Sequence, residues 1–400
     1  MNWVEKQLGD LIELFNSKRI PLNSIERKRR QGNFPYYGAQ SIVDYIDDYI
    51  FDGEYILVAE DGENLNTRKA PIANFVKGKF WVNNHAHILK AKKGKSTDFF
   101  IMYFLNTCSI SGFITGAAQP KLSKTNLLKI PIKIPDYNIQ VMITSIGLNY
   151  DKLIENNTKR IEILEEMAQR IYKEWFVDFK YPGHENDNLV DSELGMIPEG
   201  WEISDIKDVV NKVVLGGTPA RKNEKFWSGE IPWIKSGKLN DLRVLEGTEY
   251  ITQLGLEKSA TKLMPRRTVL IAITGAIIIS LSEIELCANQ SVIGLYDSPL
   301  LSQEYIYLNQ QINIHQYISK MSGSAQQHIN KDIVQNTKIL VPSINILNDF
   351  DKLIKPLFNQ VSSLLFKNKN LTSTRDYLLP KLISGKVDVS DLDIDTDIIN

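Results

Sequence analysis

Apolar residues recur every three or four positions in two long segments of the chain, residues 141–182 and 346–386. This spacing is typical of amphipathic helices. At about 1.5 Å per residue such helices are roughly 50 to 60 Å long, and long helices with a narrow apolar stripe usually pack on each other. We therefore predict two long helices packed as an antiparallel coiled coil. The positions assigned to the facing sides include Leu164, Ile171, Trp175, Leu371, Leu378 and Leu382.

Polar residues interrupt both stripes. Asn157 lies in the first, which begins at Leu153, and Asn368 lies in the second. Two interpretations are open: the asparagines are tolerated at a partly open seam, or they hold the helices in register, because a buried Asn disfavours misaligned pairings. Arg375 also falls on the second stripe, and we expect its long side chain to reach out of the seam into water.

The chain contains an internal repeat. Residues 116–124 resemble residues 323–331 at an offset of 207, which continues into the second helix, and Trp3 recurs as Trp201 at an offset of 198. The order is therefore globule, helix, globule, helix. We predict an α+β protein, a pseudo-twofold tandem repeat of two mixed α/β domains separated by the two helices. The expected boundaries are a first domain at 1–140, a central spacer helix at 141–182, a connector at 183–200, a second domain at 201–345, a C-terminal spacer helix at 346–386 and a tail at 387–400.

Composition agrees with a folded, soluble chain, because 43% of the 400 residues are hydrophobic and 24% are charged. The net charge of −1 gives no general attraction to nucleic acid. By segment, however, residues 1–150 hold 19 Lys and Arg against 14 Asp and Glu, and residues 201–345 hold 15 against 14. The connector and the tail each contain five acids and neither Lys nor Arg. Any basic surface must therefore be local.

The sequence lacks the features of secreted, membrane-spanning and disulfide-stabilised proteins. The first residues have no apolar core of a signal peptide, and the longest apolar stretch, 269–281, is shorter than the ~20 residues of a membrane helix. Two distant cysteines, Cys108 and Cys287, suit a reducing compartment rather than a disulfide framework. We therefore expect a cytoplasmic protein without membrane contact.

Motifs for catalysis are incomplete. Residues 93–97 resemble the end of a phosphate-binding loop, but Leu89 stands where that motif requires glycine. His85 and His87 could ligate a metal, yet no Cys, Asp or Glu follows at ligand spacing, so a structural or base-contacting role is favoured. We find neither the Asn-Pro-Pro-aromatic segment of amino-methyltransferases nor a Gly-x-Ser-x-Gly elbow. We therefore assign no catalytic residue, metal or bound cofactor to this chain.

Six segments together resemble a known family, the specificity (S) subunits of type I restriction–modification systems. The similarity extends over nearly the whole chain, and the segments that carry it are 165–179, 379–387, 195–201, 216–219 with 231–234, 36–39 and 83–87. The sequence departs from the family pattern at Arg267, where a glycine is usual, and at 277–279, which lacks another glycine.

The resemblance implies a non-catalytic subunit with two target-recognition domains, each contacting half of a split target in double-stranded DNA. The paired helices would act as a spacer and as a docking surface for two methyltransferase (modification) subunits, which restriction subunits then join. S-adenosylmethionine, ATP and Mg would be used by those partners. Two alternatives remain: the DNA-binding subunit of an enzyme whose one partner fuses methyltransferase and nuclease, or a coiled-coil scaffold that binds proteins only.

Candidate DNA contacts come from basic, amide and aromatic residues. A basic run near residue 28 is either a solvated face or a set of phosphate contacts. The two Gly-x-Ala-Gln loops present Gln119 and Gln326, whose amides either pair with adenine or cap the following helix. The full set is Lys18, Arg19, Arg27, Lys28, Arg29, Arg30, Tyr36, Tyr37, Gln40, Asn84, His85, Gln119, Lys121, Thr218, Arg221, Lys235, Asn289, Gln290, Gln326 and Gln327.

Overall fold

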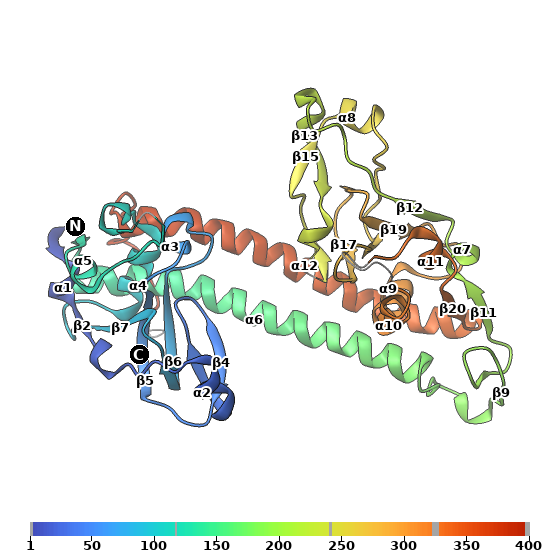
Figure 1. Cartoon of the computed structure of the whole chain (residues 1–400), viewed down its shortest axis with the longest axis horizontal. Helices are drawn as coiled ribbons and strands as arrows, with labels where there is room; N and C mark the ends of the chain where they lie inside the picture. The colour runs from blue at the N-terminus through green and yellow to red at the C-terminus, as the bar shows by residue number, and fades with distance from the viewer. Residues whose placement is uncertain (1–2, 117, 240–241, 322–327, 397–400) are drawn as a thin grey trace. The chain divides into compact units, whose positions relative to one another are not determined.

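The computed structural model describes residues 3–116, 118–239, 242–321 and 328–396 (Figure 1). The chain divides into two compact units. Unit 1 comprises residues 1–155 and 369–400, and unit 2 comprises residues 156–368. The structure contains two helices of 40 residues, α6 (Tyr137–Phe176) and α12 (Ile344–Ile383). One part of each helix belongs to unit 1 and the other part belongs to unit 2.

Unit 1 is built on a six-stranded sheet of order β2-β7-β5-β6-β3-β4, with β1 and β8 paired separately. Its elements, besides the helix stretches, are β1 (Val4–Gln7), α1 (Leu8–Leu11), β2 (Ile12–Leu14), η1 (Asn16–Lys18), α2 (Ser24–Arg29), β3 (Gln31–Tyr37), β4 (Ile42–Ile46), β5 (Phe51–Ala59), α3 (Asn64–Thr67), β6 (Ala73–Val82), β7 (Ala86–Ala91), α4 (Asp98–Thr107), η2 (Ser111–Phe113), α5 (Lys124–Leu128) and β8 (Pro131–Ile134). The helix α4 begins at its N-cap Thr97, and its residues Phe100 to Leu105 are all buried in the core of this unit.

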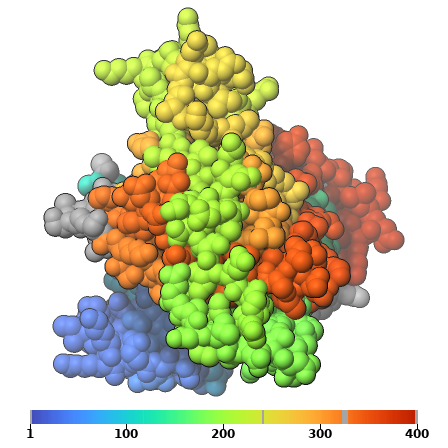
Figure 2. All heavy atoms as spheres, turned by 90° about the vertical axis from the view of Figure 1, so that its right-hand side faces the viewer, coloured from blue at the N-terminus to red at the C-terminus, as the bar shows by residue number. Residues whose placement is uncertain are grey.

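Unit 2 contains a five-stranded sheet of order β12-β19-β16-β17-β14 and a three-stranded sheet of order β15-β13-β18. Its elements are η3 (His184–Asn186), β9 (Leu189–Val190), β10 (Ile197–Pro198), β11 (Glu202–Asp205), α7 (Ile206–Val209), β12 (Lys212–Leu215), η4 (Glu224–Phe226), β13 (Trp227–Ile234), η5 (Ser236–Lys238), β14 (Arg243–Val244), β15 (Glu249–Ile251), α8 (Gln253–Glu257), β16 (Val269–Ala272), β17 (Ile278–Ser282), β18 (Cys287–Ala288), β19 (Val292–Tyr296), α9 (Gln303–Ile312), α10 (Ile314–Ile318), α11 (Lys331–Gln335) and β20 (Lys338–Val341). The strands β13 and β15 with α8 project from the rest of unit 2 (Figures 1 and 2).

The internal repeat is confirmed by strand register. In unit 1, Val4 pairs with Ile134 across β1 and β8; in unit 2, Glu202 pairs with Val341 across β11 and β20. These pairs reproduce both offsets, 202 − 4 = 198 and 341 − 134 = 207. Parallel pairing also repeats, since β3 lies beside β6 as β13 lies beside β18. The mixed helix and strand composition and the tandem plan therefore match the prediction.

The long helices are antiparallel within each unit. In unit 2 the rings of Phe176 and Phe350 lie 4.8 Å apart, and Asn157 donates a hydrogen bond to Asn368 at 2.9 Å. The asparagines therefore meet, as register control requires, although that role stays a prediction. In unit 1, α12 packs its last turns on the same core as the start of α6.

Three expectations about the helices were wrong. Leu153 is 51% exposed and does not belong to the seam. Arg375 does not reach away from α6, because its guanidinium lies 2.5 Å from a carboxylate oxygen of Asp151. The helix α6 ends at Phe176 rather than at residue 182, since the backbone of Phe179 turns into the left-handed region with φ of 54° and breaks the helical path.

The departure at Arg267 is accommodated locally. This residue adopts the left-handed conformation, with φ of 69°, which glycine adopts without strain. Its guanidinium donates to the carbonyl oxygen of Phe358 at 3.3 Å and to the side chain of Asn359 at 3.2 Å on α12. The contacts of the arginine with α12 therefore hold a turn that glycine would otherwise favour.

Candidate nucleic-acid interface

In unit 1 four of the predicted contact residues gather around two carboxylates. We call this group the Glu60 cluster; it comprises Arg19, Glu60, Asp61, Asn84, His85 and Lys121. Arg19 donates to Glu60 at 2.7 Å and to the carbonyl oxygen of Asn84 at 3.2 Å. The ammonium group of Lys121 lies 3.4 Å from the other oxygen of Glu60. His85 and Asp61 are joined by a side-chain contact of 2.7 Å.

The charges in the Glu60 cluster change the acidity of its central carboxyl group. Burial raises the pKa of Glu60, but the hydrogen bond from Arg19 and the nearby charges of Arg19 and Lys121 outweigh it. The pKa of Glu60 is therefore below its ordinary value, and the carboxylate stays ionised. It can hold the cations beside it in place.

The first Gly-x-Ala-Gln loop leads directly into this cluster. Gly116 has φ of 88°, and a Cβ atom there would lie 2.3 Å from the carbonyl oxygen of Gln119, so only glycine fits. The side chain of Gln119 is exposed. It does not cap the following helix, because the N-cap of α5 is Ser123, which accepts from Asn126. This loop therefore presents an unburied amide at the end of the sheet.

The corresponding loop of unit 2 is attached in the same way. The backbone of Leu122 donates to Glu60 in unit 1, and that of Ile329 donates to Ile273 in unit 2. The N-cap of α11 is Asn330. Gln326 and Gln327 lie outside the described residues, so nothing is assigned to their side chains.

His85 and His87 do not form a metal site together. His87 is fully buried between Asn16 and the carbonyl oxygen of Leu122, at 2.8 and 2.7 Å, and burial lowers its pKa. A neutral imidazole with both nitrogens in hydrogen bonds has a structural role here. Within the described ranges no group of three or more His, Cys, Asp or Glu could hold a metal ion.

Two of the four basic residues at 27–30 are paired with carboxylates of β4 and of the residues after it. Arg27 contacts Asp44 at 3.1 Å, and Arg30 contacts Asp47 at 2.9 Å. These arginines are therefore not free phosphate ligands, contrary to the simplest interpretation of the run. Exposed candidates near them, which the structure leaves at the surface of unit 1, are Lys18, Lys28, Arg29 and Gln40.

Two predicted aromatic contacts lie in or near the core. Tyr36 is fully buried, and its hydroxyl accepts from the backbone of Leu22 at 2.9 Å. Tyr37 is half-buried and packs edge-to-face on Phe80 with ring centroids 5.7 Å apart. Tyr36 therefore supports the strand β3 rather than offering a ring to a base.

In unit 2 the predicted residues Arg221 and Lys235 meet at Glu249. Arg221 makes two hydrogen bonds to that carboxylate, at 2.8 and 2.9 Å, and the ammonium group of Lys235 lies 3.1 Å away. The hydrogen bond from Arg221 is the main reason why the pKa of Glu249 lies below its usual range. A cavity of about 540 Å³ opens beside Arg221, lined also by Trp227 and Tyr250.

The remaining predicted residues of unit 2 adjoin this group. Thr218 donates to Gln290 at 2.6 Å, and Gln290 is exposed. The side chain of Asn289 accepts from the backbone of Ser236 and of Ser291, at 3.2 and 3.3 Å. Asn289 is therefore engaged in shaping two turns, whereas Gln290 presents its amide at the surface.

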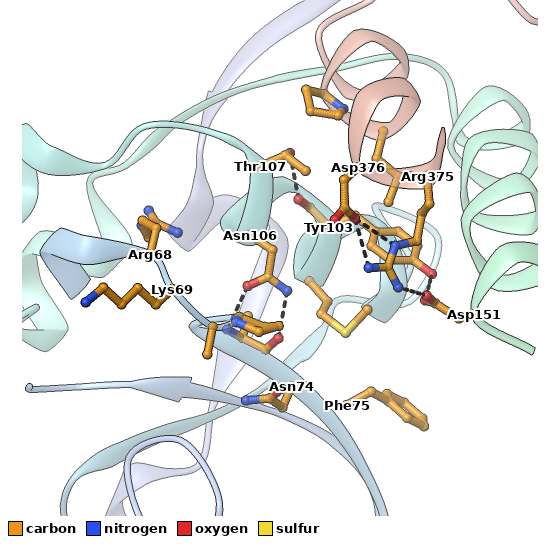
Figure 3. Close-up of a pocket in the computed structure, with 16 residues that line it drawn as sticks. Arg68, Lys69, Asn74, Phe75, Tyr103, Asn106, Thr107, Asp151, Arg375 and Asp376 are labelled. Atoms are coloured by element: carbon orange, nitrogen blue, oxygen red, sulfur yellow. Dashed lines mark hydrogen bonds and ion pairs between the residues drawn. The ribbon is translucent and has the colours of Figure 1, made fainter. Parts of the chain in front are cut away.

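A second cavity, of about 500 Å³, lies in unit 1 between α4, β6 and the two long helices (Figure 3). Tyr103 donates to Asp151 at 2.5 Å, and Arg375 binds the other oxygen of that carboxylate. Burial and the neighbouring carboxylate hold the pKa of Tyr103 far above its ordinary value, so the phenol keeps its proton. Asn106 on α4 faces the start of β6 in the same cavity.

The acidic members of these sites were not among the residues predicted from the sequence. The predicted contacts are basic, amide and aromatic groups, whereas Glu60, Asp44 and Glu249 position the arginines. One signal was present for Glu60 and Asp61, which directly follow the buried strand segment Tyr55–Ala59. Asp44 and Glu249 give no comparable signal, because only strand pairing brings them to their arginines.

Comparison with known proteins identifies relatives along the whole chain. The family model of the type I restriction modification DNA specificity domain matches residues 1–166 and 198–372. The type I restriction enzyme MjaIX specificity subunit of Methanocaldococcus jannaschii is 25% identical over 98% of this chain and 95% of its own length. The HindI specificity subunit of Haemophilus influenzae is 23% identical over 67% of this chain and 71% of its own.

A solved structure shares the fold. The S subunit of a type I restriction-modification system from M. genitalium aligns with a TM-score of 0.62 over 96% of both chains at 15% identity. None of the helices in the described residues combines the length and apolarity that a membrane-spanning segment requires.

Proposed function

Because this chain belongs to the family of type I restriction modification DNA specificity domains, we propose that it is a non-catalytic specificity subunit that recognises a bipartite target in double-stranded DNA. Unit 1 would contact one half of the target and unit 2 the other. The two spacer helices would set the length of the unread gap between the half-sites.

The observation that supports this proposal is that both units carry the same arrangement of polar groups at the surface. Each unit has a loop pinned to the end of a central sheet strand through equivalent backbone bonds, and an arginine paired with a carboxylate on a neighbouring strand. Amide and basic groups at such positions are able to contact base edges and phosphates. Two similar surfaces in one chain suit a target with two halves.

Mapping of methylated adenines in the host genome, with and without the gene for this chain, tests the proposal. We expect one split motif to lose methylation in the deletion strain and to regain it on complementation. If the deletion leaves every methylation motif unchanged, the proposal is wrong. This outcome, with co-purification of protein partners but no selective DNA binding, would favour a protein-binding scaffold.

We further propose that two methyltransferase subunits dock on the long helices and that restriction subunits join the complex. S-adenosylmethionine, ATP and Mg would then be bound by those partners. Purification of the tagged chain from its host, with mass measurement of the complex, tests the stoichiometry. A single partner that contains both methyltransferase and nuclease segments would instead support the two-chain alternative.

We also expect the isolated chain to bind DNA weakly. Arg27, Arg30 and Arg221 are already paired with carboxylates, and non-specific affinity scales with the phosphates that a protein neutralises. Binding measured between 50 and 200 mM salt should therefore show a shallow dependence for the chain alone. A steep dependence in the isolated chain would contradict this expectation.

A further inference from the structure

An arginine in unit 1 is fixed between an aromatic ring and a carboxylate. The guanidinium carbon of Arg27 lies 5.2 Å from the ring centroid of Tyr36 on β3. Its Nε donates to Asp44 at 3.1 Å, and Asp44 is the cross-strand neighbour of Tyr36 on β4. We call this group the Arg27 site.

Unit 2 contains the same arrangement on the corresponding strands. The guanidinium carbon of Arg221 lies 4.7 Å from the ring of Trp233 on β13 and 3.8 Å from that of Trp227. Glu249, which receives both hydrogen bonds from Arg221, is the cross-strand neighbour of Trp233 on β15. We call this group the Arg221 site.

The two sites match in space but not in sequence spacing. Arg27 precedes its buried aromatic residue by nine positions, 36 − 27, and Arg221 precedes Trp233 by twelve, 233 − 221. The carboxylate follows the aromatic residue by eight positions in unit 1, 44 − 36, and by sixteen in unit 2, 249 − 233. The same three-part geometry is thus reached through connections of different length, which indicates that the geometry itself is required.

Stability alone does not explain this requirement. The side chains of Arg221 and Glu249 are 43% and 34% exposed, and ion pairs this exposed contribute little to stability. Stacking and pairing do, however, fix the plane of the guanidinium. A phosphate contact needs only a positive charge, whereas reading of a base edge needs an oriented plane.

Each guanidinium keeps donors for a ligand. Of its five N–H groups, Arg27 uses one on Asp44 and one on the carbonyl oxygen of Leu22, and Arg221 uses two on Glu249. With respect to the described residues, three N–H groups remain in each case. At Arg221 the adjoining cavity of about 540 Å³, which Trp227 and Tyr250 also line, leaves room for a ligand.

From this geometry we propose that Arg221 and Arg27 are specificity-determining residues, each reading one guanine in the major groove of its own half-site. Guanine presents two acceptors, O6 and N7, that match two N–H groups of one guanidinium. A two-stranded ribbon such as β13 with β15, or β3 with β4, fits the width of that groove. This inference rests on the proposed DNA-binding function and predicts at least one G·C pair in each half-site.

The test uses the complete complex with its methyltransferase partners. Methylation motifs are mapped for the wild-type chain and for Arg221→Ala, Arg221→Lys and Arg27→Ala, with Lys258→Ala, an exposed lysine next to α8, as control. We expect Arg221→Ala to relax one G·C position in one half-site by about 5- to 150-fold, the equivalent of about 1 to 3 kcal/mol. Arg27→Ala should relax one G·C position in the other half-site, and Lys258→Ala should leave the motif unchanged.

Arg221→Lys separates base reading from charge. It keeps the positive charge but lacks the planar fork, so we expect it to relax the same position as Arg221→Ala. An unchanged motif in both Arg221 variants, or a uniform loss of methylation at all sequences with Arg221→Lys restoring it, overturns the inference. If the wild-type complex itself shows no sequence-selective methylation, the proposed function fails rather than this assignment.

Discussion

The strands β17 of unit 2 and β6 of unit 1 take corresponding places in their sheets but are flanked differently, since β14 pairs with β17 whereas β3 pairs with β6 only at its far end. In unit 2 the backbone of Leu281 on β17 donates to the carbonyl oxygen of Leu242 at 2.9 Å, because the chain adds β14 there. In unit 1 the corresponding strand β6 begins against the cavity of about 500 Å³, and Asn106 satisfies the backbone of Ala73 with hydrogen bonds of 2.8 and 2.9 Å (Figure 3).

This difference extends to the charges beside the long helices. In unit 2, Arg243 of β14 is buried between Glu165 of α6 and Glu283, at 2.8 Å from each. In unit 1 the nearest equivalent is the partly exposed pair of Arg375 and Asp151. An inserted segment therefore binds the second sheet to α6 through buried charge, whereas the ion pair of unit 1 joins the two long helices to each other and is accessible to water.

We expect the largest effect from a substitution in the buried group of Arg243, Glu165 and Glu283. Arg243→Ala leaves the buried carboxylate of Glu165 without its cation and removes the nearest of the three arginines around Glu283, and we expect it to lower the free energy of unfolding by about 3 to 5 kcal/mol. Arg375→Ala, the matched change in unit 1, should cost about 1 kcal/mol, because water reaches that pair. Urea unfolding of the full chain measures both effects, and hydrogen exchange at β14 and β17 locates the first. Equal losses in the two variants would contradict the comparison.

A second prediction concerns the polar pair in the seam of unit 2. Asn157→Leu leaves the side chain of Asn368 facing an apolar group, so we expect a loss of about 1 to 2 kcal/mol. The double variant, with leucine at both positions, should recover that loss, because apolar groups then meet each other. A double-mutant cycle measured by thermal unfolding gives the coupling. Strict additivity of the two changes would show that the asparagines do not interact.

A smaller effect should appear on acidification at the Glu60 cluster of unit 1. Glu60 has a lowered pKa in the folded state, so its stabilisation is present above its unfolded pKa and is lost as pH falls through the folded value. Unit 2 has Ile273 at the equivalent strand end. We therefore expect Glu60→Gln to lower stability at pH 7 by at most about 1 kcal/mol, after allowance for solvent screening, and this difference should shrink as the pH falls below about 4. A difference that stays constant from pH 7 into the acid range would contradict this assignment.

Much of the fold could be predicted from the sequence because it depends on local periodicity and on repetition. The three-and-four spacing located both long helices to within a few residues, and the offsets of 198 and 207 recur in the pairing of β1 with β8 and of β11 with β20. The predicted end of α6, residue 182, lies six residues too far along the chain, because the backbone leaves the helix after Phe176 and Phe179 already has the left-handed φ of 54°.

The candidate sites were predicted less completely. Arg19, Asn84, His85 and Lys121 were identified from residue type, and the structure brings them together. Tyr36 was predicted to contact DNA because it follows a basic run in the sequence. This prediction was wrong, because the ring of Tyr36 on β3 is fully buried. When apolar and polar residues do not alternate regularly along a strand, the sequence does not show which side of the strand faces the core.

By itself the sequence determined the repeat, the two helices and the family to which the chain belongs, since these depend on patterns within continuous segments. Only the tertiary structure decided which carboxylate holds each arginine. Asp44 and Glu249 reach Arg27 and Arg221 across paired strands, through connections of unequal length. Cross-strand contacts of this kind depend on register, and a shift of one residue would turn each carboxylate to the opposite face.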